Sequence, residues 1–453
     1  MPKPSVPKGT RDFSPETMTR RNYIFNTIEN VFKLFGYQPI ETPAMESLSS
    51  LLGKYGEEGD KLLFKVLNSG DFLSKVDKTK LTDPDPGNLS MKICEKGLRY
   101  DLTVPFARYV VQHRNEIQFP FKRYQIQPVW RADRPQKGRY REFYQCDVDI
   151  IGSTSLLNEA ELIRIIDLVF SNLGMPVKIN INNRKVLAGI AEEMGMGERM
   201  LQVTTALDKL DKIGMDGVFD ELKHKGAGTD ALNKLLPFLK LSGPSREKLK
   251  TVKELLAGSD IGMRGLEDVE TLFNYLDKIG LSSEVIWEVP LARGLDYYTG
   301  TIIEAVSTGI EMGSLCGGGR YDDLAGIFGM EDISGVGISF GADRIYDVMD
   351  QLGIFPESAT QVTKLLFVNF GPKEEEYILP VLDKIRMAGI PSEIFPEQAK
   401  LKKQMSYADN RNIPFVALIG ENEIRAGKIT LRNMSSGEQK ELSLEELIEE
   451  ITS

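Results

Sequence analysis

Two alternating segments constrain the fold of this chain more than any other feature. In residues 121–131 ("FKRYQIQPVWR") and again in residues 143–151 ("FYQCDVDII"), apolar or aromatic residues alternate with polar ones. A period of two predicts a β-strand with one apolar and one polar face. We therefore expect an antiparallel pair of strands that forms a floor. Its polar face would carry three candidate site residues, Arg131, Gln145 and Asp149. Surface strands also alternate, so the pattern alone does not establish a site.

The connection between these segments is basic, although the whole chain has a formal net charge of -10. Pro135 and Gly138 suit a long hairpin connection. Its basic residues are Arg131, Arg134, Lys137, Arg139 and Arg141, against the acids Asp133 and Glu142. Arginine forms forked hydrogen bonds that match phosphate oxygens. The segment is therefore either a polyphosphate site or a solvated hairpin tip. The aromatic ring of Phe143 just beyond it favours the first, since a ring beside a cation suits a nucleobase.

Composition excludes several classes of protein. A chain of 453 residues is too long for one compact core, so two or more domains are expected. The sequence has no apolar run of membrane-spanning length and no signal peptide, which predicts a cytoplasmic protein without a membrane segment. The two histidines, His113 and His224, have no partner at ligand spacing, which disfavours structural zinc and histidine-based acid–base catalysis. The cysteines Cys94, Cys146 and Cys316 are expected to be reduced thiols.

The pattern changes along the chain in a way that predicts separate domains. Residues 185–284 form a series of short amphipathic helical segments, and we interpret them as a helical insertion. The parts on either side of it, 1–184 and 285–352, would then form one domain. Residues 353–362 read as a linker. From 363 to 453 the order strand, helix, strand, helix, strand predicts a separate α/β domain.

Three further segments carry groups that could take part in chemistry. Arg344 follows Gly341 at a predicted helix start, where backbone N–H groups favour anions, although a first-turn arginine is more often a surface charge. The glycines of "GGGRYD" (317–322) would let a ligand approach the backbone, or form a tight turn. "ARGLDYYTG" (292–300) crowds Arg293, Asp296, Tyr297 and Tyr298 at the entry to a strand. Its residues would line a site, or form an ion pair beside packed tyrosines.

Taken in order, these segments resemble the histidyl-tRNA synthetase family of class II aminoacyl-tRNA synthetases. The resemblance rests on "KGTRDFSP", "RYDLTVPFARY", "WRADRPQKGRYREFYQCDVDIIG", "LARGLDYYTGTIIEA", "CGGGRYDDL" and "GVGISFGADRI", and it spans nearly the whole chain. It implies an α+β catalytic domain in which helices flank an antiparallel sheet, a helical insertion and a C-terminal α/β anticodon-binding domain. It also implies a homodimer, with "YQPIETPAME" as the dimer-forming motif. The "DLT" form at Asp101–Thr103 looks like the eukaryotic-type branch.

The resemblance implies a role for each candidate residue. Asp101, Thr103 and Gln145 would hold the amino group of histidine, and Asp149, Tyr297 and Tyr298 would line its imidazole side. ATP would be bound by Arg131, Arg139, Phe143, Arg344 and Gly319. Arg131 would also bridge the histidine carboxylate and the α-phosphate, and Arg293 would act as the catalytic arginine, in contact with the bound histidine as well. The expected ligands are L-histidine, ATP with Mg²⁺, and tRNA(His).

The implied reaction explains the absence of a nucleophile candidate. Attack of the histidine carboxylate on ATP, followed by transfer to the terminal ribose of tRNA, needs alignment and fixed positive charge and no enzyme nucleophile. Three alternatives remain open at this point: a non-catalytic regulatory relative that binds histidine, a class II synthetase for another amino acid, and a generic nucleic-acid-binding protein. The arginines and the terminal domain disfavour the first, "RGLDYYTGT" disfavours the second, and the net charge of -10 disfavours the third.

Overall fold

The chain divides into two compact units, each described here by itself. The computed structural model describes residues 3–76, 86–292, 297–322, 324–359 and 363–452. The first unit comprises Met1–Asp12 with Arg21–Ile354, and the second comprises Phe13–Arg20 with Phe355–Ser453. Within the described residues, every helix is too short or too polar to span a bilayer.

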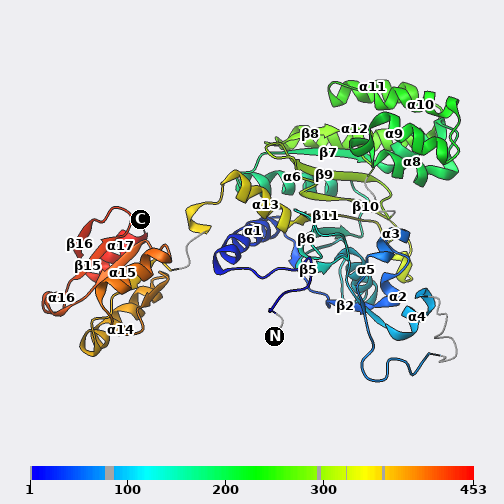
Figure 1. Ribbon diagram of the computed structural model, residues 1–453. Coiled ribbons are helices and arrows are strands. Elements are labelled where there is room, and N and C mark those ends of the chain that lie inside the picture. The colour runs from blue at the N-terminus through cyan, green and yellow to red at the C-terminus, as the bar shows by residue number, and fades with distance from the viewer. Residues whose placement is uncertain (1–2, 77–85, 293–296, 323, 360–362, 453) are drawn as a thin grey trace. The chain divides into compact units, whose positions relative to one another are not determined.

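An eight-stranded sheet organises the first unit (Figure 1). Its strands lie in the order β1-β5-β6-β11-β10-β9-β7-β8. Their bounds are β1 Gln38–Pro39, β5 Phe121–Trp130, β6 Glu142–Ile151, β11 Gly335–Gly341, β10 Cys316–Tyr321, β9 Thr301–Ser307, β7 Val177–Asn183 and β8 Glu284–Trp287. The inner pairs are antiparallel, whereas the edge strands β1 and β8 run parallel to their neighbours. The predicted pair β5 and β6 is confirmed, with Gln127 opposite Gln145 and Arg123 opposite Asp149.

The apolar face of the sheet packs against two long helices, α1 (Pro15–Leu34) and α6 (Leu157–Asn172). Phe340 of β11 lies at the centre of this contact. Its ring centroid is 5.9 Å from that of Phe32 in α1 and 5.8 Å from that of Phe170 in α6. The even-numbered residues of β6 share this buried face with Phe340, because Cys146 pairs with it across the ladder. The odd-numbered residues of β6 therefore point to the opposite face.

Smaller elements surround that opposite face. A three-stranded sheet joins β2 (Met45–Ser47), β4 (Lys96–Leu98) and β3 (Lys65–Val66). The helices near it are α2 (Leu48–Leu51), α3 (Gly56–Lys61), α4 (Pro86–Ile93) and α5 (Thr103–Gln112), followed later by the short η3 (Gly326–Phe328). Helix α13 (Ala342–Leu352) follows β11 directly, and its Asp343 forms a buried ion pair with Arg21 of α1. The starts of α5 and α13 matter for the site, since they carry residues 101–103 and 343–344.

The stretch predicted as a helical insertion is helical. Its elements are α7 (Arg184–Glu193), η2 (Gly197–Arg199), α8 (Met200–Leu207), α9 (Leu210–His224), α10 (Thr229–Leu239), α11 (Ser245–Leu255) and α12 (Asp260–Ile279). They appear in green in Figure 1. Helices α7 and α12 approach closely at Gly189, where a Cβ atom would lie 2.6 Å from the Cα of Gly262. The segment belongs to the first unit.

The second unit is built on a five-stranded sheet in the order β13-β12-β14-β15-β16. The strands are β12 (Leu365–Phe367), β13 (Ser392–Ile394), β14 (Phe415–Leu418), β15 (Ile429–Asn433) and β16 (Gln439–Leu442). The helices are η4 (Glu357–Ala359), α14 (Pro372–Met387), α15 (Leu401–Asn410), α16 (Glu421–Ala426) and α17 (Leu444–Thr452). The predicted strand–helix alternation is confirmed, since β12 pairs in parallel with β13 and β14.

Candidate active site

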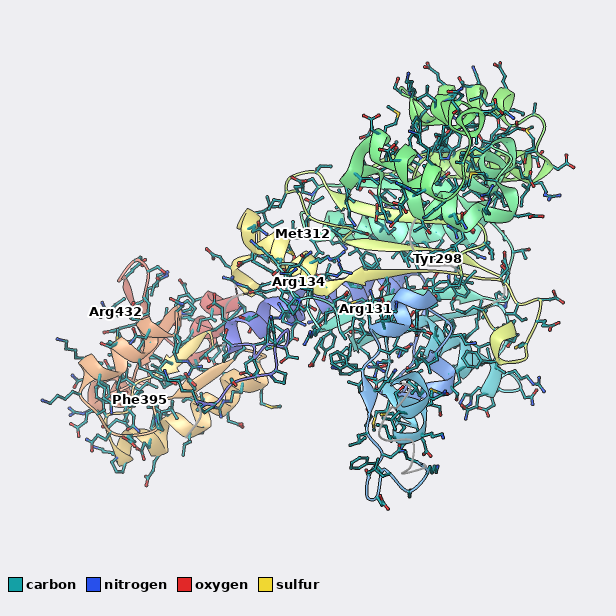
Figure 2. The ribbon with its side chains drawn as sticks, turned by 45° about the vertical axis from the view of Figure 1, so that its right-hand side comes forward. Arg131, Arg134, Tyr298, Met312, Phe395 and Arg432 are labelled. Atoms are coloured by element: carbon teal, nitrogen blue, oxygen red, sulfur yellow. The ribbon has the colours of Figure 1, made fainter. Side chains whose placement is uncertain are left out.

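The polar face of the large sheet lines a cavity of about 330 Å³. Most of the predicted site residues lie in its wall, namely Asp101, Thr103, Arg131, Arg139, Phe143, Gln145, Asp149, Tyr297, Tyr298 and Arg344. They come from elements that are far apart in the sequence. Figure 2 labels two of them, Arg131 just after β5 and Tyr298 just before β9.

One end of the cavity is acidic, and we call the carboxylates Asp101, Asp147 and Asp149 the acidic end. Asp149 is held on both sides. Its Oδ2 lies 2.7 Å from Nη2 of the buried Arg123, and its Oδ1 accepts a hydrogen bond of 2.7 Å from the Tyr321 hydroxyl. Gly337 makes this position possible, because a Cβ atom there would lie 1.9 Å from Asp149 Oδ1. Burial raises the pKa of Asp149, and the charge of Arg123 opposes that rise.

Asp101 lies at the start of α5 and uses one carboxylate oxygen there. Its Oδ1 accepts hydrogen bonds of 3.1 Å from the Tyr55 hydroxyl and from the backbone N–H of Val104. Burial raises the pKa of Asp101, and these hydrogen bonds partly oppose the effect. The rings of Tyr297 and Tyr298 are 4.8 Å apart nearby, and burial raises the pKa of Tyr297 well above its usual value. Contacts within the protein therefore hold both Asp101 and the Tyr297–Tyr298 pair in place.

Asp147 is a buried lining residue that the sequence reasoning missed as a site residue. It lies between Gln145 and Asp149 on the same face of β6, so the period-two pattern contained the signal. Burial raises its pKa to about 7, and the charge of Arg123 opposes the rise.

The cavity wall also carries arginines, and we call Arg131, Arg139 and Arg344 the cationic end. The carboxylates Asp133 and Asp343 line the same part of the wall, but both are engaged in ion pairs with arginines. The guanidinium carbon of Arg131 lies 4.2 Å from the ring centroid of Tyr100 and 5.2 Å from that of Phe143. Its Nε donates a 3.0 Å hydrogen bond to the carbonyl of Tyr100. Arg131 is thus oriented by two rings and one carbonyl.

The other two arginines differ in how firmly they are held. Arg139 forms an ion pair of 3.0 Å with Asp133, but half of its side chain is exposed (51%). Arg344 donates from Nε to the carbonyl of Gly138 at 2.9 Å and from Nη1 to that of Ser314 at 2.7 Å. It therefore connects the start of α13 to residues 131–141, which we call the basic loop.

The N-terminal residues Lys8–Arg11, which we call the strap, also hold the basic loop. The backbone N–H of Arg141 donates a 2.9 Å hydrogen bond to the carbonyl of Gly9. Gly9 has a φ of +89°, and a Cβ atom there would lie 2.8 Å from Arg141 Cγ. The guanidinium carbon of Arg11 lies 3.2 Å from the ring centroid of Tyr140, and Arg11 forms an ion pair with Asp343 of α13. In the sequence, the "KGTRD" segment contributed to the family resemblance, but nothing in it indicated that it holds the basic loop.

One predicted site residue among those the structure describes, Gly319, is absent from the cavity wall. Gly319 is on the cavity face of β10, but it is absent from the lining, and a Cβ atom there would lie 2.9 Å from the Tyr298 ring. Its missing side chain makes room for that ring, whereas Gly317 and Gly318 do line the cavity. Arg293, the expected catalytic arginine, lies outside the described residues.

The cavity can hold an elongated ligand with opposite charges at its two ends. Strand β6 runs from Phe143 beside Arg131 to Asp149, a span of about 20 Å at 3.3 Å per residue. The arginines suit phosphate or carboxylate groups, and the carboxylates suit a cation or several N–H donors. Between the arginines and the carboxylates, the face of β6 can hold two substrates in a fixed relative orientation, which a reaction between two bound substrates requires.

Comparison with known proteins identifies the family. The family model described as histidyl-tRNA synthetase matches residues 9–75 and 78–345, and the anticodon binding domain model matches residues 364–453. A histidine–tRNA ligase of Phocaeicola vulgatus is 58% identical over 446 residues, covering 98% of both chains, and one of Bacteroides fragilis is 59% identical over 450 residues, covering 99% of both.

The fold agrees with a solved structure of the same family. The crystal structure of histidyl-tRNA synthetase from Nostoc sp. PCC 7120 shares 32% identity, covers 99% of this chain and 98% of its own, and superposes with a TM-score of 0.85. These relatives are bacterial, so they give no support to the eukaryotic-type branch that the "DLT" form suggested. By sequence match over most of its length and by its class II fold, the chain belongs to the histidyl-tRNA synthetase family.

Proposed function

We propose that this protein is a histidine–tRNA ligase. It activates L-histidine with ATP to histidyl-adenylate, releases pyrophosphate and transfers histidine to the 3′ end of tRNA(His). The observation that carries the proposal is the single cavity with a cationic and an acidic end, in a chain that is 58% identical to a histidine–tRNA ligase. A zwitterionic amino acid and a nucleoside triphosphate together match that arrangement of charge.

In the first step, the histidine carboxylate attacks the α-phosphorus of ATP and the bond to pyrophosphate breaks. Negative charge on the phosphate oxygens is stabilised by fixed arginines. Arg131 takes the central role, bridging the carboxylate and the α-phosphate, because it is held by the carbonyl of Tyr100 and lies between two rings. Arg139 reaches the outer phosphates, which suits its exposure. Arg293 is assigned as the catalytic arginine from the family motif alone.

The adenine lies between Phe143 and Arg344 in this proposal. Two carbonyl acceptors, those of Gly138 and Ser314, hold the guanidinium plane of Arg344 in one orientation, as stacking on a base requires. We assign the close backbone approach to Gly317 and Gly318, since Tyr298 covers Gly319.

L-Histidine lies at the acidic end. Asp101, Thr103 and Gln145 bind its ammonium group, and Asp149, Tyr297 and Tyr298 line the imidazole side. Buried polar groups that must pair with a substrate reject an analogue that lacks the matching group. Support for this assignment comes from the burial of Asp101 and Asp149 and from their fixed hydrogen bonds.

Mg²⁺ enters as the counter-ion of ATP in this proposal. The described residues contain no group of three or more His, Cys, Asp or Glu side chains placed to hold a metal ion. The residues present do not fit a metal site made by the protein alone, and Mg²⁺ in nucleotide sites is commonly held by substrate phosphates. No step is derived through the ion.

The second unit binds the anticodon stem of tRNA(His), and the chain forms a homodimer through the segment around Pro43. The anticodon binding domain model over residues 364–453 supports the first assignment. The edge position of β1, which precedes Pro43, supports the second. We also propose a reducing, cytoplasmic location, in keeping with three buried free cysteines. Deletion of residues 360–453 should weaken tRNA charging far more than adenylate formation, and equal loss of both would contradict the anticodon role.

Amino-acid-dependent pyrophosphate exchange tests the central proposal. The wild-type protein should exchange pyrophosphate into ATP with L-histidine and with no other amino acid. Exchange with a different amino acid would reassign the substrate, and no exchange with any would indicate a non-catalytic relative. The Arg293→Ala variant should fold and lose nearly all exchange. Unchanged exchange in that folded variant would remove Arg293 from catalysis.

A further inference from the structure

Buried acceptor oxygens without a partner gather in the cavity. Among the described lining residues, Asp101 Oδ2, Gln145 Oε1 and Asp147 Oδ1 have no hydrogen-bond partner. Asp149 Oδ2 differs from these, because it lies 2.7 Å from Arg123 Nη2. A buried acceptor left unpaired is costly, so these three oxygens indicate a ligand that brings N–H donors.

Hydrogen bonds within the wall orient two of the three oxygens. Gln145 donates from Nε2 to the Ser339 hydroxyl at 2.7 Å. The nitrogen end of the Gln145 amide is therefore engaged, and Oε1 is its unpartnered end. Asp101 is oriented in the same way, because its Oδ1 accepts from Tyr55 and Val104 while Oδ2 has no partner. Asp147 lies opposite Ser339 in the ladder between β6 and β11, and its buried Oδ1 is likewise unpartnered.

The groups that face Asp147 come from each neighbouring element. Gln145 and Asp149 flank it along β6, Gln125 of β5 and Ser339 of β11 lie opposite it in the ladders, and Arg123 and Asp101 act on its charge. Arg123 is already paired with Asp149. The negative charge of the cluster therefore exceeds what the protein itself neutralises, which favours a cationic ligand group.

We propose that Asp147 binds the α-ammonium group of L-histidine as a third acceptor, beside Asp101 and Gln145. An ammonium group has three N–H donors, and the wall offers three unpartnered buried acceptors. The inference rests on the proposed function, since it takes L-histidine as the substrate. It adds a residue that selects an α-amino acid with a free, charged amino group.

Asp147→Asn tests this, because asparagine keeps the shape of the side chain and its capacity to accept a hydrogen bond while removing the charge. L-Histidine binding to the full-length protein is measured in pyrophosphate exchange at pH 8 and pH 6. At pH 8 the KM for L-histidine should rise about tenfold or more, with the KM for ATP unchanged. At pH 6 the difference should shrink, because the wild-type carboxyl is then largely protonated. The imidazole of the substrate titrates alike with both proteins.

Two competitive inhibitors identify the group that Asp147 meets. L-Histidinol keeps the ammonium group, and 3-(imidazol-4-yl)propionate lacks it. The variant should bind L-histidinol about tenfold more weakly and bind the propionate no more weakly than the wild type does. If the variant binds both inhibitors equally more weakly than the wild type, or binds both as tightly as the wild type, the proposal is overturned.

The matched control is Asp167→Asn, which alters a buried carboxylate of α6 that accepts from the backbone of Ser282 and Ser283 outside the cavity. It should leave the KM for L-histidine unchanged, and a rise equal to that of Asp147→Asn would mean that loss of any buried carboxylate has the same effect. If the wild-type protein shows no histidine-dependent exchange, the proposed function fails. If the wild type is active and Asp147→Asn binds histidine normally, only this inference fails.

Discussion

The acidic end of the cavity is built on strands, whereas the cationic end is built on a loop and a helix start. Asp149 is 3% exposed and lies between Arg123 and Tyr321, so ligand binding has little left to order there. Arg139 is 51% exposed and forms an ion pair with Asp133 within the basic loop. The comparison teaches that the amino acid meets a preformed site, while the nucleotide meets two held arginines, Arg131 and Arg344, and one, Arg139, that can adjust. Selection of the amino acid depends on a preformed site, whereas release of pyrophosphate is easier from a contact that can move.

The largest expected difference between the two ends is in stability. Asp149→Ala would leave Arg123 buried without its partner, and we expect the free energy of unfolding to fall by about 3–5 kcal/mol. Asp133→Ala removes the partner of the half-exposed Arg139, and its cost should stay below about 1 kcal/mol. Urea unfolding of both variants measures the difference. Equal costs would mean that the acidic end is no more preformed than the cationic end.

The next effect is on the chemical step. Arg131→Ala should lower the rate of histidine-dependent pyrophosphate exchange by about 10²–10³, because a fixed positive charge at the α-phosphate is lost. Arg131→Lys should recover part of this loss, since it restores charge but not the fork. Circular dichroism of each variant controls for folding. A variant with Ala at 131 and a normal exchange rate would separate this arginine from catalysis.

The pH dependence of stability should also differ between the ends. The folded pKa of Asp147 is raised to about 7, so its protonated form is favoured in the folded state. Its contribution to stability is therefore present at low pH and lost as pH rises through about 7, by up to about 1.4 kcal/mol per pH unit.

Thermal unfolding of the ligand-free protein between pH 6 and pH 8 measures this effect. The wild type should lose stability across the window, and Asp147→Asn should lose less. Saturating L-histidine should reduce the wild-type loss, because it supplies a counter-charge. If stability falls equally with pH in the wild type and in Asp147→Asn, Asp147 is not the group that titrates in this window.

The smallest expected effect concerns the strap. Arg11→Ala removes the contact with the Tyr140 ring and one of the ion pairs of Asp343, while Arg21 still holds that carboxylate at 2.6 Å. The basic loop should then be less ordered, raising the KM for ATP about threefold to fivefold, which corresponds to about 1 kcal/mol. The KM for L-histidine should not change. A change in the KM for L-histidine alone would mean that the strap supports the acidic end of the cavity, and this would contradict its assignment to the basic loop.

Local patterns were sufficient to predict much of the fold. The alternation in residues 121–131 and 143–151 predicted β5 and β6, and their pairing put Gln145 and Asp149 on the cavity face. The same alternation implied that Asp147 shares that face. Its importance was not evident from sequence, because neither its burial nor its unpartnered oxygen can be read from a pattern.

Contacts between distant segments were beyond such reasoning. Asp149 depends on Tyr321 and on the absence of a side chain at Gly337, and both follow from the register of β6, β11 and β10. Gly319 shows a related limit: a glycine cluster suggested room for a ligand, and the sequence did not reveal that the ring of Tyr298 lies beside this residue. A sequence indicates which residues are small or charged, and only the packed structure decides what occupies the space beside them.

The strap has a consequence for the order in which the protein matures during synthesis. The strap precedes its partners along the chain, which are Tyr140 and Arg141 first and then Asp343 of α13. Its hydrogen bond to Arg141 can form as soon as the basic loop has been translated, but its ion pair with Asp343 requires the chain to be translated as far as α13. Until then the basic loop also lacks the two hydrogen bonds that tie it and its surroundings to Arg344. The contacts that hold the basic loop are therefore completed only when the last strand of the cavity and the helix after it have been made.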